Sequence, residues 1–159
     1  MDDSVEITRP ITDDFTLSLW ISPSRPSPVG TECYHGHSLI WSDMPGSRND
    51  FILALLNDKP CMFTGGPDTS VLGSTEVITG QWAHLAATRS KATGEVTVYL
   101  NGVLENTARA GSASLDANDR VYIGANTWDR VYFEGAIDDV RLYDRVLTEA
   151  DIWALYSQW

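Results

Sequence analysis

An aromatic side chain stands in an otherwise polar segment, Ala125-Asn126-Thr127-Trp128-Asp129-Arg130, between two apolar runs. An indole at such a position can stack on the C–H face of a sugar ring, while a nearby guanidinium or amide group bonds to the sugar hydroxyls. Packing of the indole on the rim of the fold is the alternative. We therefore take Trp128 and Arg130 as candidate ligand contacts.

A second polar segment, 43–50, concentrates carboxylate, guanidinium and amide groups between two apolar runs. Such groups can converge on the hydroxyls of a ligand, whereas a solvated loop is the alternative reading. The candidate contacts in this segment are Arg48, Asn49 and Asp50.

Tyr34 supplies a further candidate ring and is followed by two imidazoles, His35 and His37. These imidazoles are two residues apart and can share one face of a strand. A transition-metal site needs at least a third ligand, which the local spacing does not supply. We therefore retain Tyr34 as a ligand contact and do not predict a histidine metal site.

The spacing of the carboxylates argues against glycoside hydrolysis. The two carboxyl groups of a retaining glycosidase lie about 5 to 5.5 Å apart. Glu134 and Asp138 are the nearest pair on one expected strand, and four residues of strand separate them by about 13 Å. The chain also lacks the nucleophile elbow of serine hydrolases. Carboxylates that meet across strands are the alternative, and we predict that the protein is not an enzyme.

Short apolar runs alternate with turn residues along the whole chain, which predicts an all-β protein. Asn101-Gly102 is typical of a two-residue type I′ hairpin, because both residues tolerate a positive φ. The expected strands are 5–8, 15–21, 38–41, 51–56, 61–64, 75–78, 82–88, 95–100, 121–124 and 136–143.

One helix is expected at the C-terminus. Thr148 is a suitable N-cap with Asp151 three residues later, which is the spacing of a capping box. Leu147 precedes the cap and can pack on Ile152, so the helix is expected to turn Ile152 and Leu155 inward and to run to about residue 156.

Alternation in the last expected strand predicts which side chains share a face. Ala136, Asp138, Val140 and Leu142 lie two residues apart and should line one face. That face is apolar except at Asp138. A carboxylate in a core-facing row needs a partner, because burial of an unpaired charge is unfavourable.

Four motifs, in this order, resemble the laminin G-like branch of the concanavalin A-like lectin/glucanase jelly rolls, and together they cover about residues 4–157. They are F-T-L-S-L-W at 15–20, Q-W-A-H-L-A-A-T at 81–88, V-T-V-Y-L-N-G at 96–102 and F-E-G-A-I-D-D-V-R-L-Y at 133–143. The resemblance implies an antiparallel β-sandwich jelly roll that spans 1–159 as a single domain. Such sandwiches serve lectins, adhesins, receptor modules and some hydrolases, so the fold does not settle the activity.

The resemblance also implies roles for individual residues. Related jelly rolls hold a structural Ca²⁺ near the late strand, and carried over by position Asp138 would be its side-chain ligand, with Asp2 or Asp3 nearby. Carboxylates and backbone carbonyls are suitable Ca²⁺ ligands. The alternative is that Asp138 is capped by backbone N–H groups or paired with an arginine. Trp20 and Trp82 match positions that are buried in the family.

The composition of the chain limits the classes of molecule that it is expected to bind. Eleven basic and 22 acidic residues give a net charge of −11, and no basic cluster is present, which disfavours nucleic acid. The same charge favours neutral over anionic glycans and, at low salt, a monomer. No apolar stretch reaches the roughly 18 residues of a membrane helix, so membrane insertion is not expected.

The two cysteines, Cys33 and Cys61, permit one disulfide, and two free thiols are the alternative. A disulfide suits an oxidising compartment. No signal peptide is visible at Met1-Asp2-Asp3-Ser4. The family normally has a further strand before 5–8, so we expect a domain trimmed at its N-terminus. The resemblance implies an extracellular or cell-surface location within a larger protein.

The leading prediction is a non-catalytic module that binds a glycan or glycoconjugate. The runner-up is a protein-interaction or adhesion domain without a sugar site.

Overall fold

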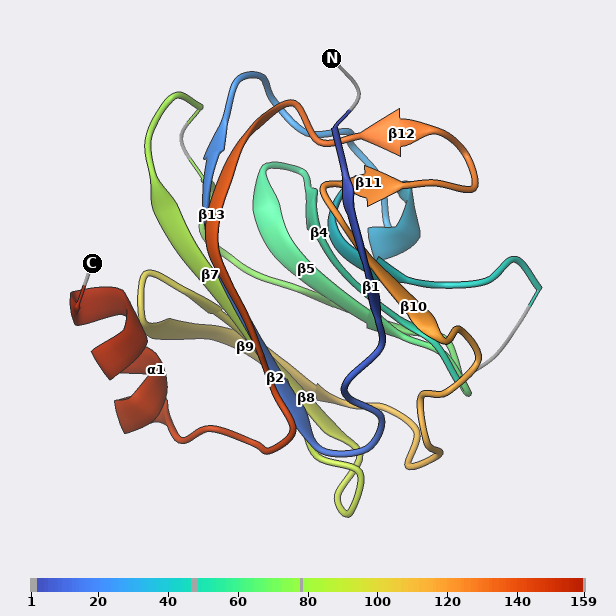
Figure 1. Cartoon of the computed structure of the whole chain (residues 1–159). Helices are drawn as coiled ribbons and strands as arrows, with labels where there is room; N and C mark the ends of the chain where they lie inside the picture. Colours follow the sequence, from blue (N-terminus) through green and yellow to red (C-terminus); the bar gives the residue numbers. More distant parts are fainter. Residues whose placement is uncertain (1–2, 47–48, 78, 159) are drawn as a thin grey trace.

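The computed structural model describes residues 3–46, 49–77 and 79–158. Within these residues two antiparallel sheets face each other, and one C-terminal helix lies outside them (Figure 1). The first sheet has the strand order β1 (Val5–Thr8), β10 (Arg120–Ile123), β3 (His37–Ser42), β4 (Phe51–Leu56), β5 (Lys59–Thr64), β6 (Thr69–Leu72). The second has the order β13 (Gly135–Tyr143), β2 (Phe15–Pro23), β7 (Ala83–Arg89), β8 (Glu95–Leu100), β9 (Val103–Arg109).

The remaining elements are small. A two-stranded hairpin, β11 (Ala125–Asn126) and β12 (Val131–Tyr132), follows β10. The helices are a 3-10 turn, η1 (Cys33–His35), and an α-helix, α1 (Glu149–Ser157). The predicted antiparallel sandwich with a short C-terminal helix is therefore confirmed. No helix in the described ranges is long and apolar enough to cross a membrane.

Alternate residues of the facing strands form the main core, as the period of two along a strand requires. Leu17 and Leu85 point inward from the five-stranded sheet, and Leu53 and Met62 point inward from the six-stranded sheet. All four are fully buried. Burial of each side chain of this size contributes about 1.5 to 3 kcal/mol, so the core holds the two sheets face to face.

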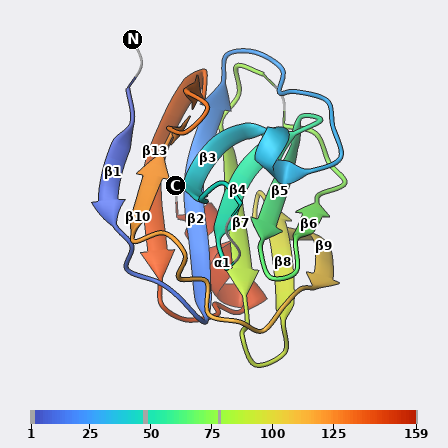
Figure 2. The same ribbon diagram turned by 90° about the vertical axis from the view of Figure 1, so that its right-hand side faces the viewer.

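The outer face of the six-stranded sheet is partly covered by η1. Ile52, Ala54 and Leu56 point to this face and form a second apolar cluster with Cys33 and Cys61. The two cysteines form a disulfide, which confirms the predicted pairing, with 5.6 Å between their Cα atoms. Figure 2 shows η1 as the short blue helix in front of β4 and β5.

The outer face of the five-stranded sheet carries α1 (Figure 1). The side chain of Thr148 accepts a hydrogen bond from the Asp151 amide, and the Asp151 carboxylate accepts one from the Thr148 amide, which confirms the capping box. Leu147 and the fully buried Ile152 pack together against this sheet, and Leu155 packs beside them. The predicted helix is therefore correct in its start and in its buried face.

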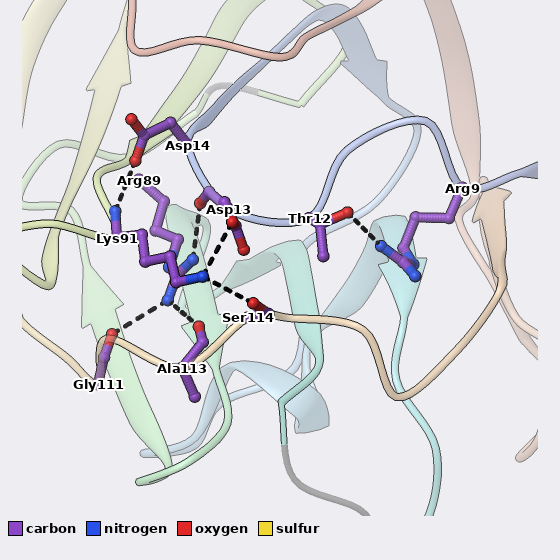
Figure 3. A network of polar contacts seen from close by, with 9 residues as sticks. All are labelled: Arg9, Thr12, Asp13, Asp14, Arg89, Lys91, Gly111, Ala113 and Ser114. Atoms are coloured by element: carbon purple, nitrogen blue, oxygen red, sulfur yellow. Dashed lines mark hydrogen bonds and ion pairs between the residues drawn. The ribbon is translucent and has the colours of Figure 1, made fainter.

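A polar network closes one end of the sandwich (Figure 3). Arg89, at the end of β7, is fully buried, and its guanidinium donates to the carbonyl oxygens of Asp13 at 2.6 Å, Gly111 at 3.2 Å and Ala113 at 2.5 Å. Burial lowers the pKa of Arg89. Beside it, Lys91 forms an ion pair with Asp13 at 2.9 Å. Because the guanidinium joins two loops that lie far apart in the sequence, its role is structural.

The predicted assignment of residues to the two faces of the last strand is wrong, because β13 contains a bulge. The register with β2 shifts between Asp138 and Arg141, and Asp139 has a positive φ of 47°. A bulge adds one residue and reverses the alternation beyond it. Val140 and Leu142 therefore face the core together with Ile137, while Asp138 lies opposite Trp20 on the outer face and is exposed.

Other details also differ from expectation. The expected strand at 75–78 is wrong for its described residues, since β6 ends at Leu72 and the Val77 amide instead donates to the Asp58 carbonyl at 2.6 Å. Trp20 is buried as expected, but Trp82 is 40% exposed. Trp82 was expected to begin a strand, but β7 begins one residue later, at Ala83.

Candidate functional site

A hollow of about 280 Å³ opens at one end of the six-stranded sheet, beside the chain segment that joins β3 to β4. We call it the acidic hollow, because three of its lining side chains are carboxylates. Its lining residues are Tyr34, Asp43, Met44, Pro45, Gly46, Asp50, Phe63 and Asp68.

Strand register brings these residues together. Ser42, at the end of β3, pairs with Phe51 at the start of β4, and Phe51 pairs with Thr64 at the end of β5. Asp43 and Asp50 therefore flank the first pair, while the turn after β5 lies beside them. The amide of Gly65 in that turn donates to the carbonyl oxygen of Asp50 at 2.9 Å.

Asp50 is the most unusual group in the hollow, since it is only 2% exposed. Its Oδ2 is 3.5 Å from the Met44 amide, and its Oδ1 has no hydrogen-bond partner in the structure. Burial raises the pKa of Asp50 to about 8, and the hydrogen bond to the Asp43 carboxyl and the negative charge of Asp43 act in the same direction. Asp50 is therefore mostly protonated at neutral pH.

Gly65 controls where the Asp50 side chain lies. A Cβ atom at Gly65 would overlap Oδ1 of Asp50. Real side chains do not tolerate such an approach, so any larger residue at this position must displace the carboxyl group. The absence of a side chain at Gly65 thus permits Asp50 to pack against the turn.

The aromatic part of the hollow comes from Tyr34 and Phe63. Their rings meet edge to face, with 5.4 Å between centroids and an interplanar angle of 87°. Tyr34 follows Cys33, whose disulfide to β5 ties η1 to the same sheet that carries Phe63. The disulfide therefore positions one wall of the hollow.

The structure places the candidate contacts of the 43–50 segment in different surroundings. Asp50 lines the hollow, but it is buried and so is not part of a simply solvated loop. Asn49 adopts a positive φ of 69°, and its carbonyl oxygen accepts from the Ala117 amide at 3.0 Å, outside the lining set. Arg48 lies outside the described residues.

Trp128 and Arg130 lie elsewhere, on the turn between β11 and β12. The Asn126 side chain organises this turn, because its Oδ1 accepts from the amides of Trp128 at 3.0 Å and Asp129 at 3.1 Å. Trp128 is 68% exposed, and Arg130 has a φ of 57°. The turn thus presents the indole largely to solvent.

The hollow and the Trp128 turn are separated by the length of β3. The Gly124 amide, just before β11, donates to Leu39 near the start of β3, whereas Asp43 follows its last residue. The structure therefore joins Tyr34 and Asp50 in one site and does not join Trp128 or Arg130 to it.

The residues expected to hold Ca²⁺ are not brought together. Asp138 is exposed on the outer face of β13, and its Oδ1 accepts from the amide of Asp139 at 2.7 Å. Asp3 lines a separate apolar hollow with Ile137 and Val140, on the opposite face of that strand. Asp2 lies outside the described residues. In the part of the chain that is described, no three His, Cys, Asp or Glu side chains are grouped to hold a metal. Asp138 and Asp3 as placed therefore do not fit a shared calcium ion.

The histidines have structural surroundings. His37 is buried and His35 is exposed. His84 is buried in the outer face of the five-stranded sheet, and its Nε2 lies 2.8 Å from Oγ of Ser18. Burial lowers the pKa of His84 to about 4, so its imidazole is neutral at physiological pH.

Six of the eight described lining residues were not predicted as individual contacts, and among them are Asp43, Phe63 and Asp68. The last two flank the Gly-Gly-Pro turn after β5. The turn between β4 and β5 is the signal that could have located them. In an antiparallel hairpin the end of the second strand lies beside the start of the first, so the end of β5 lies beside the start of β4.

Comparisons with known proteins agree with the fold. The chain is 28% identical over 163 residues to the pentraxin-related protein PTX3 of Mus musculus, and the match covers 95% of this chain but only 41% of that protein. The chain thus spans about two fifths of the length of this curated relative.

Solved structures of the same fold include two carbohydrate complexes. Domain 4 of AbnA, an extracellular arabinanase from Geobacillus stearothermophilus solved with arabinotriose, matches with a TM-score of 0.65, 25% identity, and 92% and 68% coverage of the two chains. The sialyllactose-bound CBM40 of a Ruminococcus gnavus sialidase matches with a TM-score of 0.73, 15% identity, and 97% and 96% coverage.

The family model covers nearly the whole chain, from residue 2 to residue 153, and includes every strand described above. The protein therefore belongs to the laminin G-like family of the concanavalin A-like lectin/glucanases superfamily.

Proposed function

We propose that this protein is a non-catalytic carbohydrate-binding module and that the acidic hollow is its glycan site. The observation that carries the proposal is the convergence of two aromatic rings, Tyr34 and Phe63, with the carboxyl groups of Asp43, Asp50 and Asp68. Rings contact the apolar faces of sugars, and carboxyl oxygens accept hydrogen bonds from hydroxyls.

The size of the hollow suits a short glycan. Its volume of about 280 Å³ is close to the lower limit of small-molecule sites, which start at roughly 300 Å³. One or two sugar residues fill such a space, while the rest of a chain extends into solvent. The two similar structures described above were each solved with a bound oligosaccharide, which supports this class of ligand.

The Asp43 and Asp50 pair supports binding rather than hydrolysis. Asp43 lies close enough to Asp50 to raise its pKa, both through hydrogen bonding and through its negative charge. A retaining glycosidase instead holds its two carboxyl groups about 5 to 5.5 Å apart, with the scissile bond between them. Carboxyl groups that lie within hydrogen-bonding reach of each other do not match that separation.

The exposed Trp128 provides a second contact for a longer glycan. Its indole is presented by a turn that Asn126 holds in place, so stacking would cost little ordering of the chain. The hollow and Trp128 would then bind separate parts of one glycoconjugate. The Cys33–Cys61 disulfide supports an extracellular setting, because such bonds persist in oxidising compartments.

Screening against an oligosaccharide array, followed by calorimetry, tests the proposal. We expect millimolar or tighter binding of at least one oligosaccharide, weakened about tenfold by Tyr34→Ala and largely kept by Tyr34→Phe, which retains the ring. The same oligosaccharide should be recovered intact after incubation. Absence of binding across the array, or release of a cleaved product, would contradict the proposal.

A protein-interaction domain is the second candidate function. Trp153 of α1 is 52% exposed and Val103 at the start of β9 is 56% exposed. The two lie close together, since Trp153 packs against Gly102. Exposed aromatic surface of this kind is common at protein interfaces. If Trp153→Ala abolishes binding to a partner protein while no glycan binds, this alternative replaces the first.

A further inference from the structure

Three carboxylates line the acidic hollow, and none of its described lining residues is basic. Asp43 is half-buried, Asp50 is almost fully buried, and Asp68 is exposed at the mouth. The protein as a whole also carries a net negative charge of −11. Coulomb repulsion in the hollow therefore opposes any anionic ligand group.

The state of Asp50 indicates that no described residue of the hollow supplies it with a positive charge. A buried carboxylate is stabilised by a cation or by several N–H donors. Among N–H donors of the described residues, the Asp50 carboxyl has the long contact from the Met44 amide, and its Oδ1 has no hydrogen-bond partner. Burial and the neighbouring Asp43 raise its pKa to about 8, and no described cation offsets these two effects.

A ligand can supply the positive charge that the described residues of the hollow do not. From these observations we propose that the acidic hollow selects glycans that carry a protonated amine, such as glucosamine units, over neutral and anionic glycans. This inference rests on the proposed glycan function and deepens it by naming the ligand class. An ammonium group bound in the hollow beside Asp43 can replace the Asp43–Asp50 contact with hydrogen bonds to these carboxylates, and such charge-assisted bonds are about twice as strong as neutral ones.

The aromatic wall is compatible with the same ligand. Tyr34 and Phe63 border the hollow, and an ammonium group is attracted to the faces of aromatic rings. The ring carbons of the sugar would lie against this wall while the amine points to the carboxylates. An N-acetyl group removes the positive charge and adds bulk, so acetylated units should bind less well.

Binding of an ammonium should also release a proton. In the free protein Asp50 is mostly protonated at neutral pH, as shown above, and the bound ammonium favours the ionised carboxylate. The proton then passes to the buffer. The apparent binding enthalpy should consequently depend on the ionisation enthalpy of the buffer, and this dependence should vanish in Asp50→Asn.

The test compares three β-1,4-linked trisaccharides that differ only in the group at C2, namely a hydroxyl, an acetamide or a protonated amine. Calorimetry with the full chain, in EDTA and at slightly acidic pH, should show the glucosamine trimer binding at least tenfold more tightly than the other two. Asp50→Asn and Asp43→Asn should each remove most of this preference. Added salt should reduce it, since screening weakens the attraction.

Asp144→Asn is the matched control. Asp144 is exposed just beyond β13, in the other sheet, so its substitution changes the net charge equally without touching the hollow. The control should keep the full preference for the amine. Circular dichroism of each variant shows whether it folds, and Asp43→Asn provides a second probe if Asp50→Asn is unstable.

Three results would overturn the inference. Equal affinities for the three trisaccharides would exclude amine selection while leaving the glycan function in place. A preference that survives both carboxylate substitutions would place the amine elsewhere. A preference that appears only when EDTA is omitted would assign the hollow to a metal ion. If ethanolamine instead binds as tightly as the glucosamine trimer and no neutral glycan binds, the proposed glycan function fails and the hollow is an amine site only.

Discussion

The carboxyl group of Asp50 is buried against that of Asp43, at the point where β4 begins, and the pKa of Asp50 is raised to about 8. In the unfolded chain an aspartate loses its proton near pH 4. The folded state therefore binds more protons than the unfolded state between about pH 4 and pH 8. Asp50 thus makes the free energy of unfolding fall as the pH rises through this window.

Replacement of Asp50 by Asn removes this dependence, because the amide resembles the protonated acid and does not titrate. We expect Asp50→Asn to match the wild type near pH 4 and to exceed its stability by roughly a few kcal/mol at pH 8. Denaturant unfolding at several pH values measures the difference. A constant difference across this range would show that the folded state does not raise the pKa of Asp50.

His84 makes the free energy of unfolding depend on pH in the opposite direction. Its pKa falls from about 6.5 to about 4 on folding because the imidazole is buried. Below pH 6.5 the unfolded state binds the extra proton, so the contribution of His84 is lost as the pH falls toward 4. We expect this contribution to be roughly 3 kcal/mol at most. NMR titration of the His84 ring nitrogens checks the value, and a midpoint above pH 6 would contradict it.

Trp128→Ala should change binding without changing stability. The indole is 68% exposed, so its removal costs little packing. If the indole stacks on a sugar, its loss should reduce affinity about tenfold, which corresponds to about 1.4 kcal/mol. Calorimetry with an oligosaccharide of three or more units measures the effect, and Trp128→Phe should recover part of it. Unchanged affinity would remove Trp128 from the glycan site.

The Cys33–Cys61 disulfide should be a major source of stability. It closes a loop with a sequence separation of 28 residues, for which the chain-entropy model gives roughly 3 to 4 kcal/mol. The double variant Cys33→Ala, Cys61→Ala should unfold at a correspondingly lower denaturant concentration and should lose affinity for glycan, because η1 then no longer fixes Tyr34. Reduction of the wild type should reproduce both effects. Identical unfolding with and without reductant would exclude this contribution.

Calcium is still a prediction of the family resemblance, and thermal melts test it. If calcium binds, a hundredfold excess over Kd adds about 2.7 kcal/mol to the native state relative to EDTA. Because Asp138 is exposed on the outer face of β13, we expect Asp138→Asn to leave any such effect unchanged. A calcium effect that Asp138→Asn abolishes would restore Asp138 as a ligand.

The sequence was sufficient for the local features of this protein. Short apolar runs bounded by turn residues located strands such as β4 and β8 with their correct ends. The hairpin turn at Asn101 and Gly102 has the two positive φ values that these residue types favour. The capping box at Thr148 and Asp151 likewise depends only on residues three apart.

Only the tertiary structure decided which polar groups meet. Asp43, Asp50 and Asp68 come from three chain segments, and the register of β3, β4 and β5 brings them to one hollow. Their shared burial raises the pKa of Asp50, an effect that no property of the isolated residue contains.

The bulge in β13 is the clearest limit of sequence reasoning. A strict period of two assigned Asp138 to the core, and one extra residue at the positive-φ Asp139 moved it to the outer face. Alternation is counted from neighbour to neighbour, so a single irregularity inverts every assignment on one side of it. Whether a strand contains such an irregularity depends on the pairing with β2, and that pairing forms only when the two strands meet in the folded sheet.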